Sequence, residues 1–192
     1  MVIKKSWPVN RSDVKQAAQS ENSKPRWCAY QAPYPEPRAQ RKNQYYARLL
    51  MDDMAGMVSE LSAITQYLYH HQMLHERYPD VADLLKCISI VEMTHMELLG
   101  ETILQLGGKP KFGVMTNRGR EWWRGDFVYY GYDICDMLSA DINSEREAIV
   151  TYKKHIEMID DEYIKALLAR IILDEEHHLE AFTEKKQKYC RD

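Results

Sequence analysis

The sequence predicts an all-α protein, an antiparallel four-helix bundle with one long crossover between its second and third helices. Only eight Gly and three Phe occur among the 192 residues, a composition that favours helices over a sheet-rich sandwich. From about Gln44 onward, apolar residues recur three and four positions apart, which is typical of helices that bury one face. A chain of this length can bury one sizeable core, so we expect a single domain with an appended arm.

Breaks in this periodicity divide the chain into four expected helices. The first covers about residues 44–75, and the second starts after Pro79-Asp80 and stops at Gly107. The third covers about residues 132–159, and the fourth starts at Asp160 or Asp161 and ends near Lys186. Asp80 can cap the second helix, and the run Gly107-Gly108-Lys109-Pro110 can end it. The short break between the last two helices makes them antiparallel neighbours. The stretch 107–130 is long enough to cross the bundle, and we expect its aromatic residues to cover the core: Trp122, Trp123, Tyr129 and Tyr130.

Residues 1–43 are predicted to form a basic, Pro-rich arm, and residues 44–192 the helical domain. Five of the seven prolines lie in the first 37 residues, where no apolar period is sustained. The arm has nine Lys and Arg against three Asp and Glu, a charge of +6. Because the whole chain has a net charge of −3, the remaining residues carry −9. An acidic body argues against nucleic acid as a partner. No arm residue continues a helical seam, so we expect the arm to be dispensable for the functional site.

The cysteines and the apolar runs bear on the compartment. Four cysteines lie far apart without a Cys-x-x-Cys pair, which argues against a rubredoxin-type iron site or a zinc ribbon: Cys28, Cys87, Cys135 and Cys190. We therefore expect reduced thiols and a cytoplasmic protein. The N-terminus has no signal-like apolar stretch, and no run of about 18 apolar residues could cross a membrane. Neither export nor a membrane partner is predicted.

Each expected helix has an apolar seam that contains one glutamate, and these are Glu60, Glu92, Glu145 and Glu175. The first seam reads Met57, Glu60, Ile64, Tyr67, His71 and Leu74. Glu92 and Glu175 begin Glu-x-x-His motifs, whose spacing puts both side chains on one helix face. The histidines of the two motifs are His95 and His178.

Four carboxylates that face one interior repel each other, and burying each of them unpaired costs several kcal/mol. Two divalent cations would neutralise the four charges and leave coordination positions open for water, oxygen or peroxide. One Glu from each of two helices and a Glu-x-x-His from each of the other two is the arrangement of di-iron and di-manganese bundles. We therefore predict a dinuclear metal site with six ligands: Glu60, Glu92, His95, Glu145, Glu175 and His178.

An internal repeat supports this prediction. Residues 60–67 and 145–152 match as Glu-x-x-Ala-Ile-x-x-Tyr, and residues 92–97 and 175–180 match as Glu-x-x-His-x-Glu. The glutamates of the two halves are separated by 32 and 30 residues. Two similar helical hairpins would build a pseudo-symmetric site.

On these motifs, residues 44–188 resemble the ferritin-like superfamily, most closely bacterioferritins, rubrerythrins and the manganese-catalase-like proteins of spore-forming bacteria. The resemblance implies a ferritin-like bundle in which Glu60 and Glu145 are terminal ligands and Glu92 and Glu175 bridge or nearly bridge. It implies further that each histidine binds one metal. Tyr67 and Tyr152, seven residues after the single glutamates, resemble hydrogen-bond partners of the ligands, with a core-packing role as the alternative.

In bacterioferritin-like sites, an Asp just before the glutamate of one Glu-x-x-His motif commonly pairs with the histidine of the other motif. Asp174 precedes Glu175, whereas Val91 precedes Glu92. His95 should therefore have an aspartate partner, and His178 should lack one.

Several other residues have the side chains or the spacing of metal ligands. Asp174 and His177 have ligand spacing, but Arg170 shares their helix stripe, so Glu175 and His178 are preferred. Four further histidines are interpreted as surface or core-edge residues: His70, His71, His75 and His155. Ala148 stands where rubrerythrins typically have a further glutamate, which weakens that branch. Met93 occupies the position of the bacterioferritin haem ligand, but a core or interface role is favoured and no bound haem is expected.

The leading functional hypothesis is a di-iron oxidoreductase that oxidises Fe(II) with O2 or H2O2, in iron or oxidative-stress handling. The first alternative is a manganese catalase with two Mn ions, because this donor set does not choose between first-row metals. The second is a non-catalytic metal-storage protein or a structural protein of a spore or shell. In each case we expect a homo-oligomer, a dimer or larger.

Overall fold

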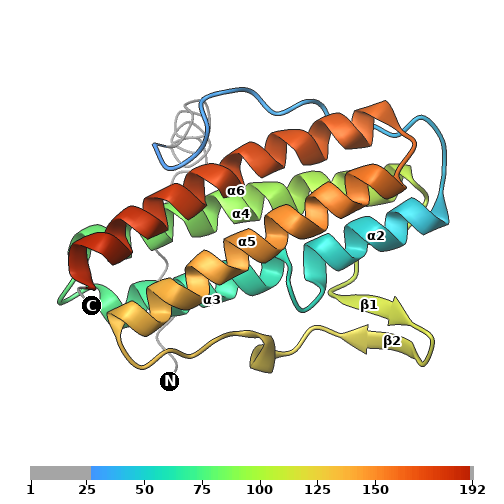
Figure 1. The fold of residues 1–192 in the computed structure, drawn as a ribbon. Coiled ribbons are helices and arrows are strands. Elements are labelled where there is room, and N and C mark those ends of the chain that lie inside the picture. Colours follow the sequence, from blue (N-terminus) through green and yellow to red (C-terminus); the bar gives the residue numbers. More distant parts are fainter. Residues whose placement is uncertain (1–26, 191–192) are drawn as a thin grey trace, which may run out of the picture.

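The structure, a computed structural model, describes residues 27–190. Its helices are Gln44–Ala55 (α2), Glu60–Leu74 (α3), Pro79–Gln105 (α4), Ile134–Met158 (α5) and Glu162–Tyr189 (α6). α3 and α4 form one helical hairpin, and α5 and α6 form the other (Figure 1). A long crossover joins the two hairpins, so the expected four-helix architecture is confirmed.

The expected first helix is in fact two helices. α2 stops before Gly56 and α3 begins at Glu60, and Figure 1 shows them one after the other along the same side of the bundle. A side chain at Gly56 would not fit, because its Cβ would lie 2.6 Å from the backbone oxygen of Asp52. Ser59 caps α3, where its Oγ accepts a hydrogen bond from the backbone N of Ser62 at 3.3 Å. The break therefore puts Glu60 in the first turn of a helix, where free N–H groups favour a carboxylate.

The other helices begin and end close to their expected positions, but Asp80 does not cap α4. The residue before this helix is Tyr78, which makes no side-chain cap hydrogen bond. Asp80 instead accepts hydrogen bonds from Lys185 and Tyr189, each at 2.7 Å, and so fastens the end of α6 to the start of α4. Asp161 caps α6, where its side chain accepts hydrogen bonds from two backbone N–H groups.

The crossover contains a short antiparallel hairpin that the sequence did not predict. β1 (Gly113–Thr116) pairs with β2 (Gly119–Trp122), and a 3-10 turn, Gly125–Phe127, follows. The expectation that the crossover aromatics cover the core is wrong for three of them, which are exposed: Trp122, Tyr129 and Tyr130. Trp123 donates its indole N–H to Ser62 Oγ at 3.0 Å and so ties the crossover to α3.

A polar layer divides the apolar core into two clusters. On α4, residues up to Val91 belong to one cluster and residues from Leu99 onward to the other. The same change occurs on α6, between Ile172 and Phe182. The predicted site residues occupy this gap on both helices, so the layer lies in the middle of the bundle.

The four cysteines form two disulfides, and the expectation of reduced thiols is wrong. Cys28 is bonded to Cys87, with their Cα atoms 6.1 Å apart, and Cys135 is bonded to Cys190, with 5.6 Å between Cα atoms. Disulfides of this kind persist mainly in oxidising compartments, so the cysteines no longer support a cytoplasmic location. Within residues 27–190, no helix combines the length and the apolar character needed to cross a bilayer.

We predict that a Cys135→Ser, Cys190→Ser variant folds but is less stable than the parent. The bond closes a loop with a sequence separation of 55 residues, and the loss of such a constraint on the unfolded chain costs about 2–4 kcal/mol. Urea unfolding without reductant measures the free energy of unfolding of both proteins. Equal stabilities would show that this bond adds nothing to the fold.

Candidate metal centre

The polar layer brings together all six of the predicted ligands, and each of them is buried: Glu60, Glu92, His95, Glu145, Glu175 and His178. They come from α3, α4, α5 and α6 and form two groups whose donor atoms lie within 4.8 Å of one another. One group contains Glu60 and His95, and the other contains Glu145 and His178. Glu92 and Glu175 belong to both groups.

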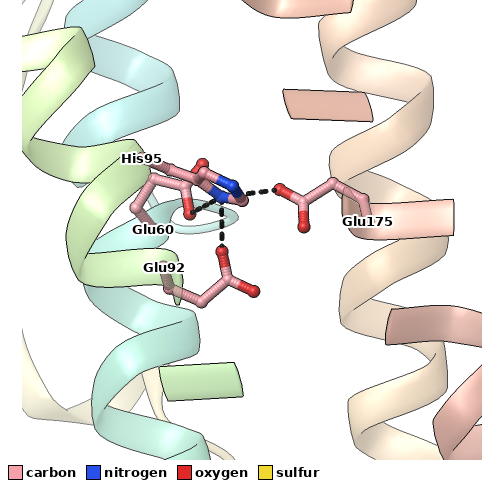
Figure 2. A group of neighbouring side chains, drawn as sticks. All are labelled: Glu60, Glu92, His95 and Glu175. Carbon is pink, nitrogen blue, oxygen red and sulfur yellow. Dashed lines mark hydrogen bonds and ion pairs between the residues drawn. The ribbon is translucent and has the colours of Figure 1, made fainter. Parts of the chain in front are cut away.

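The first group surrounds Nδ1 of His95, as Figure 2 shows. This nitrogen lies 2.8 Å from Glu92 Oε2, 3.4 Å from Glu175 Oε1 and 3.7 Å from Glu60 Oε2. Three carboxylates and one imidazole thus converge on a single point. A cation at this point would be surrounded by the oxygen and nitrogen donors that first-row metals accept.

The second group surrounds Nδ1 of His178 in the same way. The distances are 2.9 Å to Glu92 Oε1, 3.1 Å to Glu175 Oε2 and 3.8 Å to Glu145 Oε2. Glu92 and Glu175 therefore each direct one oxygen toward each histidine. This is the orientation that a carboxylate needs to bridge two ions.

Both predicted tyrosines contact the site, and each does so across the two hairpins. Tyr67 on α3 donates its hydroxyl to Glu145 Oε1 on α5 at 2.5 Å. Tyr152 on α5 donates its hydroxyl to Glu60 on α3. Both rings are also buried in the apolar clusters, so the hydrogen-bonding and the packing interpretations hold together.

The two histidines differ on the side that faces away from the site. His95 Nε2 lies 2.9 Å from Asp174 Oδ2, which is the aspartate that the sequence indicated. His178 Nε2 is buried and, among the described residues, makes no hydrogen bond. A partner at this nitrogen fixes the tautomer of a metal-binding histidine and makes it a better ligand.

Asp174 has more partners than sequence reasoning found. Arg170, which shares a helix face with Asp174, is buried, and its Nη1 lies 2.8 Å from Asp174 Oδ2. Two arm residues also donate to Asp174: the Tyr34 hydroxyl at 2.5 Å and the Tyr30 backbone N at 2.7 Å. Burial alone would raise the pKa of Asp174, but the hydrogen bonds from His95, Tyr34 and Arg170 hold it at about 2. The arm therefore contacts a neighbour of the metal ligands, although no arm residue continues a helical seam.

Two further buried Asp–His pairs flank the site, and sequence reasoning placed their histidines at the surface or core edge. His70 Nδ1 lies 2.8 Å from Asp141 Oδ1, and His155 Nδ1 lies 2.8 Å from Asp53 Oδ1. The signal in the sequence is that the internal repeat extends beyond Tyr67 and Tyr152 to include a histidine in each half. His70 and His155 each stand ten residues after a single seam glutamate and three after its tyrosine.

Several of the buried acids and bases have raised pKa values and so bind protons more tightly than they would in water. Burial and the neighbouring Glu175 raise the pKa of Glu145 to about 8. Burial also raises the pKa of Glu60, while nearby glutamates outweigh burial and raise the pKa of both site histidines. Glu92 Oε1 lies 2.9 Å from His178 Nδ1 without a well-aligned hydrogen bond within the described residues, so this buried oxygen is an acceptor for a cation. The donor set therefore fits a metal pair, whose binding would release protons.

A cavity of about 240 Å³ leads to the site. It extends from the exposed residues Met57 and Glu147 to the buried site glutamates. Met57 was placed on the first seam, but it is 66% exposed because it lies in the break between α2 and α3. The same break therefore supplies one wall of the cavity. A space of this size admits small molecules.

A model of the ferritin-like domain matches residues 55–189. The chain belongs to the ferritin-like family. A probable manganese catalase of Clostridium acetobutylicum is 28% identical over 169 residues, which cover 79% of this chain and 74% of the relative. A bacterioferritin of Streptomyces coelicolor is 30% identical over 128 residues, or 65% of this chain and 71% of the relative. The crystal structure of a manganese catalase from Anabaena superposes with a TM-score of 0.74 at 25% identity, covering 83% and 78% of the two chains.

We predict that the purified protein binds about two metal ions per chain and that a Glu92→Ala, Glu175→Ala variant loses most of them, since both side chains would touch both ions. Metal content after dialysis against Mn(II) or Fe(II) measures this. The matched control replaces the exposed glutamates of the same repeat, Glu97→Ala with Glu180→Ala, and should keep both ions. Full occupancy in the first variant would remove these residues from the site.

A second prediction concerns the unequal histidines. The ion at His95 should bind more tightly than the ion at His178, because an outer partner of a ligand typically changes affinity by about 10- to 100-fold. Stepwise metal titration should resolve two dissociation constants, and Asp174→Asn should bring them closer together. Two equal constants in the parent protein would contradict this.

Proposed function

We propose that the chain is a dinuclear metal oxidoreductase that consumes hydrogen peroxide, with manganese-catalase activity as its leading assignment. The observation that carries the proposal is the pair of central carboxylates, Glu92 and Glu175, each directed at both histidines. Glu60 and Glu145 complete the set, one on each side. Such an arrangement suits two ions held close together, which can exchange electrons in pairs.

Redox-active metal ions bound here would store electrons between two half-reactions of peroxide. In the first, one H2O2 is oxidised to O2 and releases two electrons and two protons. In the second, those electrons and protons reduce another H2O2 to two molecules of water. The cycle balances without an external reductant, and its only substrate is small enough for the cavity of about 240 Å³.

Residues around the centre would fix the positions of its carboxylate ligands. Tyr67 and Tyr152 hold Glu145 and Glu60 in place by hydrogen bonds from the opposite hairpin. The two apolar clusters would keep water away from the layer except through the cavity. Carboxylates that are held in place and largely shielded from water need to move little when the charge of the ions changes.

The choice between manganese and iron depends on the relatives. Iron oxidation was the leading hypothesis from the sequence alone. The probable manganese catalase matches 79% of this chain and the bacterioferritin 65%, which supports the catalase assignment. Fe(II) oxidation at the same site is the second candidate, supported by the 30% identity with that bacterioferritin. We also propose that the chain forms a homo-oligomer, a dimer or larger.

The test is oxygen release from peroxide by the protein loaded separately with Mn(II) and with Fe(II). A catalase should release one O2 for every two H2O2, and the Glu92→Ala, Glu175→Ala variant should not. Rapid O2 consumption by the Fe(II) protein, with no O2 release by the Mn(II) protein, would support the ferroxidase instead. A fully loaded protein that turns over neither substrate would reject both and favour a storage or structural role.

A further inference from the structure

The arm reaches the site through a segment that a disulfide fastens to α4. Cys28 is buried and bonded to Cys87, which lies on α4 five residues before Glu92. The segment then runs along α6, where Arg170 binds its backbone. The guanidinium donates to the carbonyl of Tyr30 at 2.8 Å and to that of Ala32 at 3.0 Å. Residues 28–34, which we name the clamp, are thus held at Cys28, Tyr30 and Ala32.

The clamp closes on Asp174. Its two donors occupy both oxygens of the carboxylate, with the Tyr30 N on Oδ1 and the Tyr34 hydroxyl on Oδ2. The Tyr34 ring also stacks against Arg170, whose guanidinium carbon lies 4.3 Å from the ring centre. These contacts hold the Asp174 carboxylate against the arm.

The oxygen that Tyr34 binds is the oxygen that faces His95. Asp174 Oδ2 lies 2.9 Å from His95 Nε2, and the Tyr34 hydroxyl itself lies 3.3 Å from the same nitrogen. A carboxylate fixed at Nε2 keeps the proton on that nitrogen and leaves the Nδ1 lone pair free for a metal. At His178, Nε2 has no such partner among residues 27–190.

We propose that the clamp is a positioning element of the metal centre, which holds Asp174 against His95 and so tightens the binding of one ion and not the other. The inference rests on the proposed metal site. Tyr34 and Tyr30 act through Asp174 and are positioning residues that do not themselves reach the ions.

Because a disulfide anchors the clamp, its effect on the site depends on redox state. A small dithiol can break the Cys28–Cys87 bond, giving two cysteine thiols while the dithiol supplies two electrons and two protons and becomes a disulfide. With the anchor gone, ordering residues 28–34 costs conformational entropy that the bond had already removed. Reduction should therefore weaken the binding of the ion at His95.

The test is stepwise Mn(II) titration of the full chain, compared with two variants that open the clamp. Cys28→Ser with Cys87→Ser removes the anchor, and Tyr34→Ala removes the hydroxyl and the ring. Both should weaken the tighter constant by about 10-fold or more, the same constant that Asp174→Asn changes. The weaker constant and the total of about two ions should stay unchanged. Treating the parent with a dithiol, then removing it, should reproduce the effect.

The matched control is the other disulfide, opened by Cys135→Ser with Cys190→Ser, which should leave both constants unchanged. Unchanged constants in both clamp variants would overturn the clamp and leave the metal centre intact. Equal weakening of both constants, in the clamp variants and the control alike, would show general loosening of the fold and also overturn it. A parent chain that binds no metal would reject the proposed function itself, and the clamp with it.

Discussion

Four buried glutamates in one layer of the bundle are the constraint on which the rest of the structure depends. Unpaired, each would cost several kcal/mol of burial. The two site histidines, the two tyrosine hydroxyls and the first turn of α3 each contribute to neutralising or hydrogen-bonding them. The helices consequently change character at one level, apolar above and below and polar between, and this change separates the two core clusters. Every polar atom of such a layer that lacks a hydrogen-bond partner adds a cost of burial, and within residues 27–190 these atoms include His178 Nε2 and Glu92 Oε1.

The repeat explains which parts of the site are symmetric and which are not. Residues that recur at the same spacing in both halves form matched contacts in the crossed tyrosine bonds. His70 and His155 also recur and each pairs with an aspartate, but the two aspartates, Asp141 and Asp53, stand at different positions of the repeat. The difference enters where the halves differ in sequence, with Asp174 before one motif and Val91 before the other. The arm enlarges this difference, because its Tyr30 and Tyr34 donate hydrogen bonds to Asp174. A pseudo-symmetric frame thus carries two chemically distinct positions.

Much of the fold and the site was predictable because it depends on local spacing. Glu-x-x-His fixes two side chains on one helix face whatever surrounds them, and the alternating seams orient α4, α5 and α6. The missed features depend on distant contacts. Tyr34 and Asp174 are 140 residues apart, and the cysteines of the two disulfides are separated by 59 and 55 residues. No local pattern specifies such pairings, whereas Gly56 followed by the capping Ser59 was a local signal for the helix break that periodicity concealed.

That break shows why a partly wrong helix still placed the ligands correctly. Glu60, Ile64 and Tyr67 all follow it, so their shared face is set within α3 and does not depend on α2. Met57 lies inside the break, loses the helical phase and becomes exposed. The residues that leave the helix line the cavity, and the residue that restarts it is Glu60, a member of the cluster. The interruption therefore links ligand placement to access, because one short irregular segment supplies both the helix start at the carboxylate and the opening through which a small substrate would reach it.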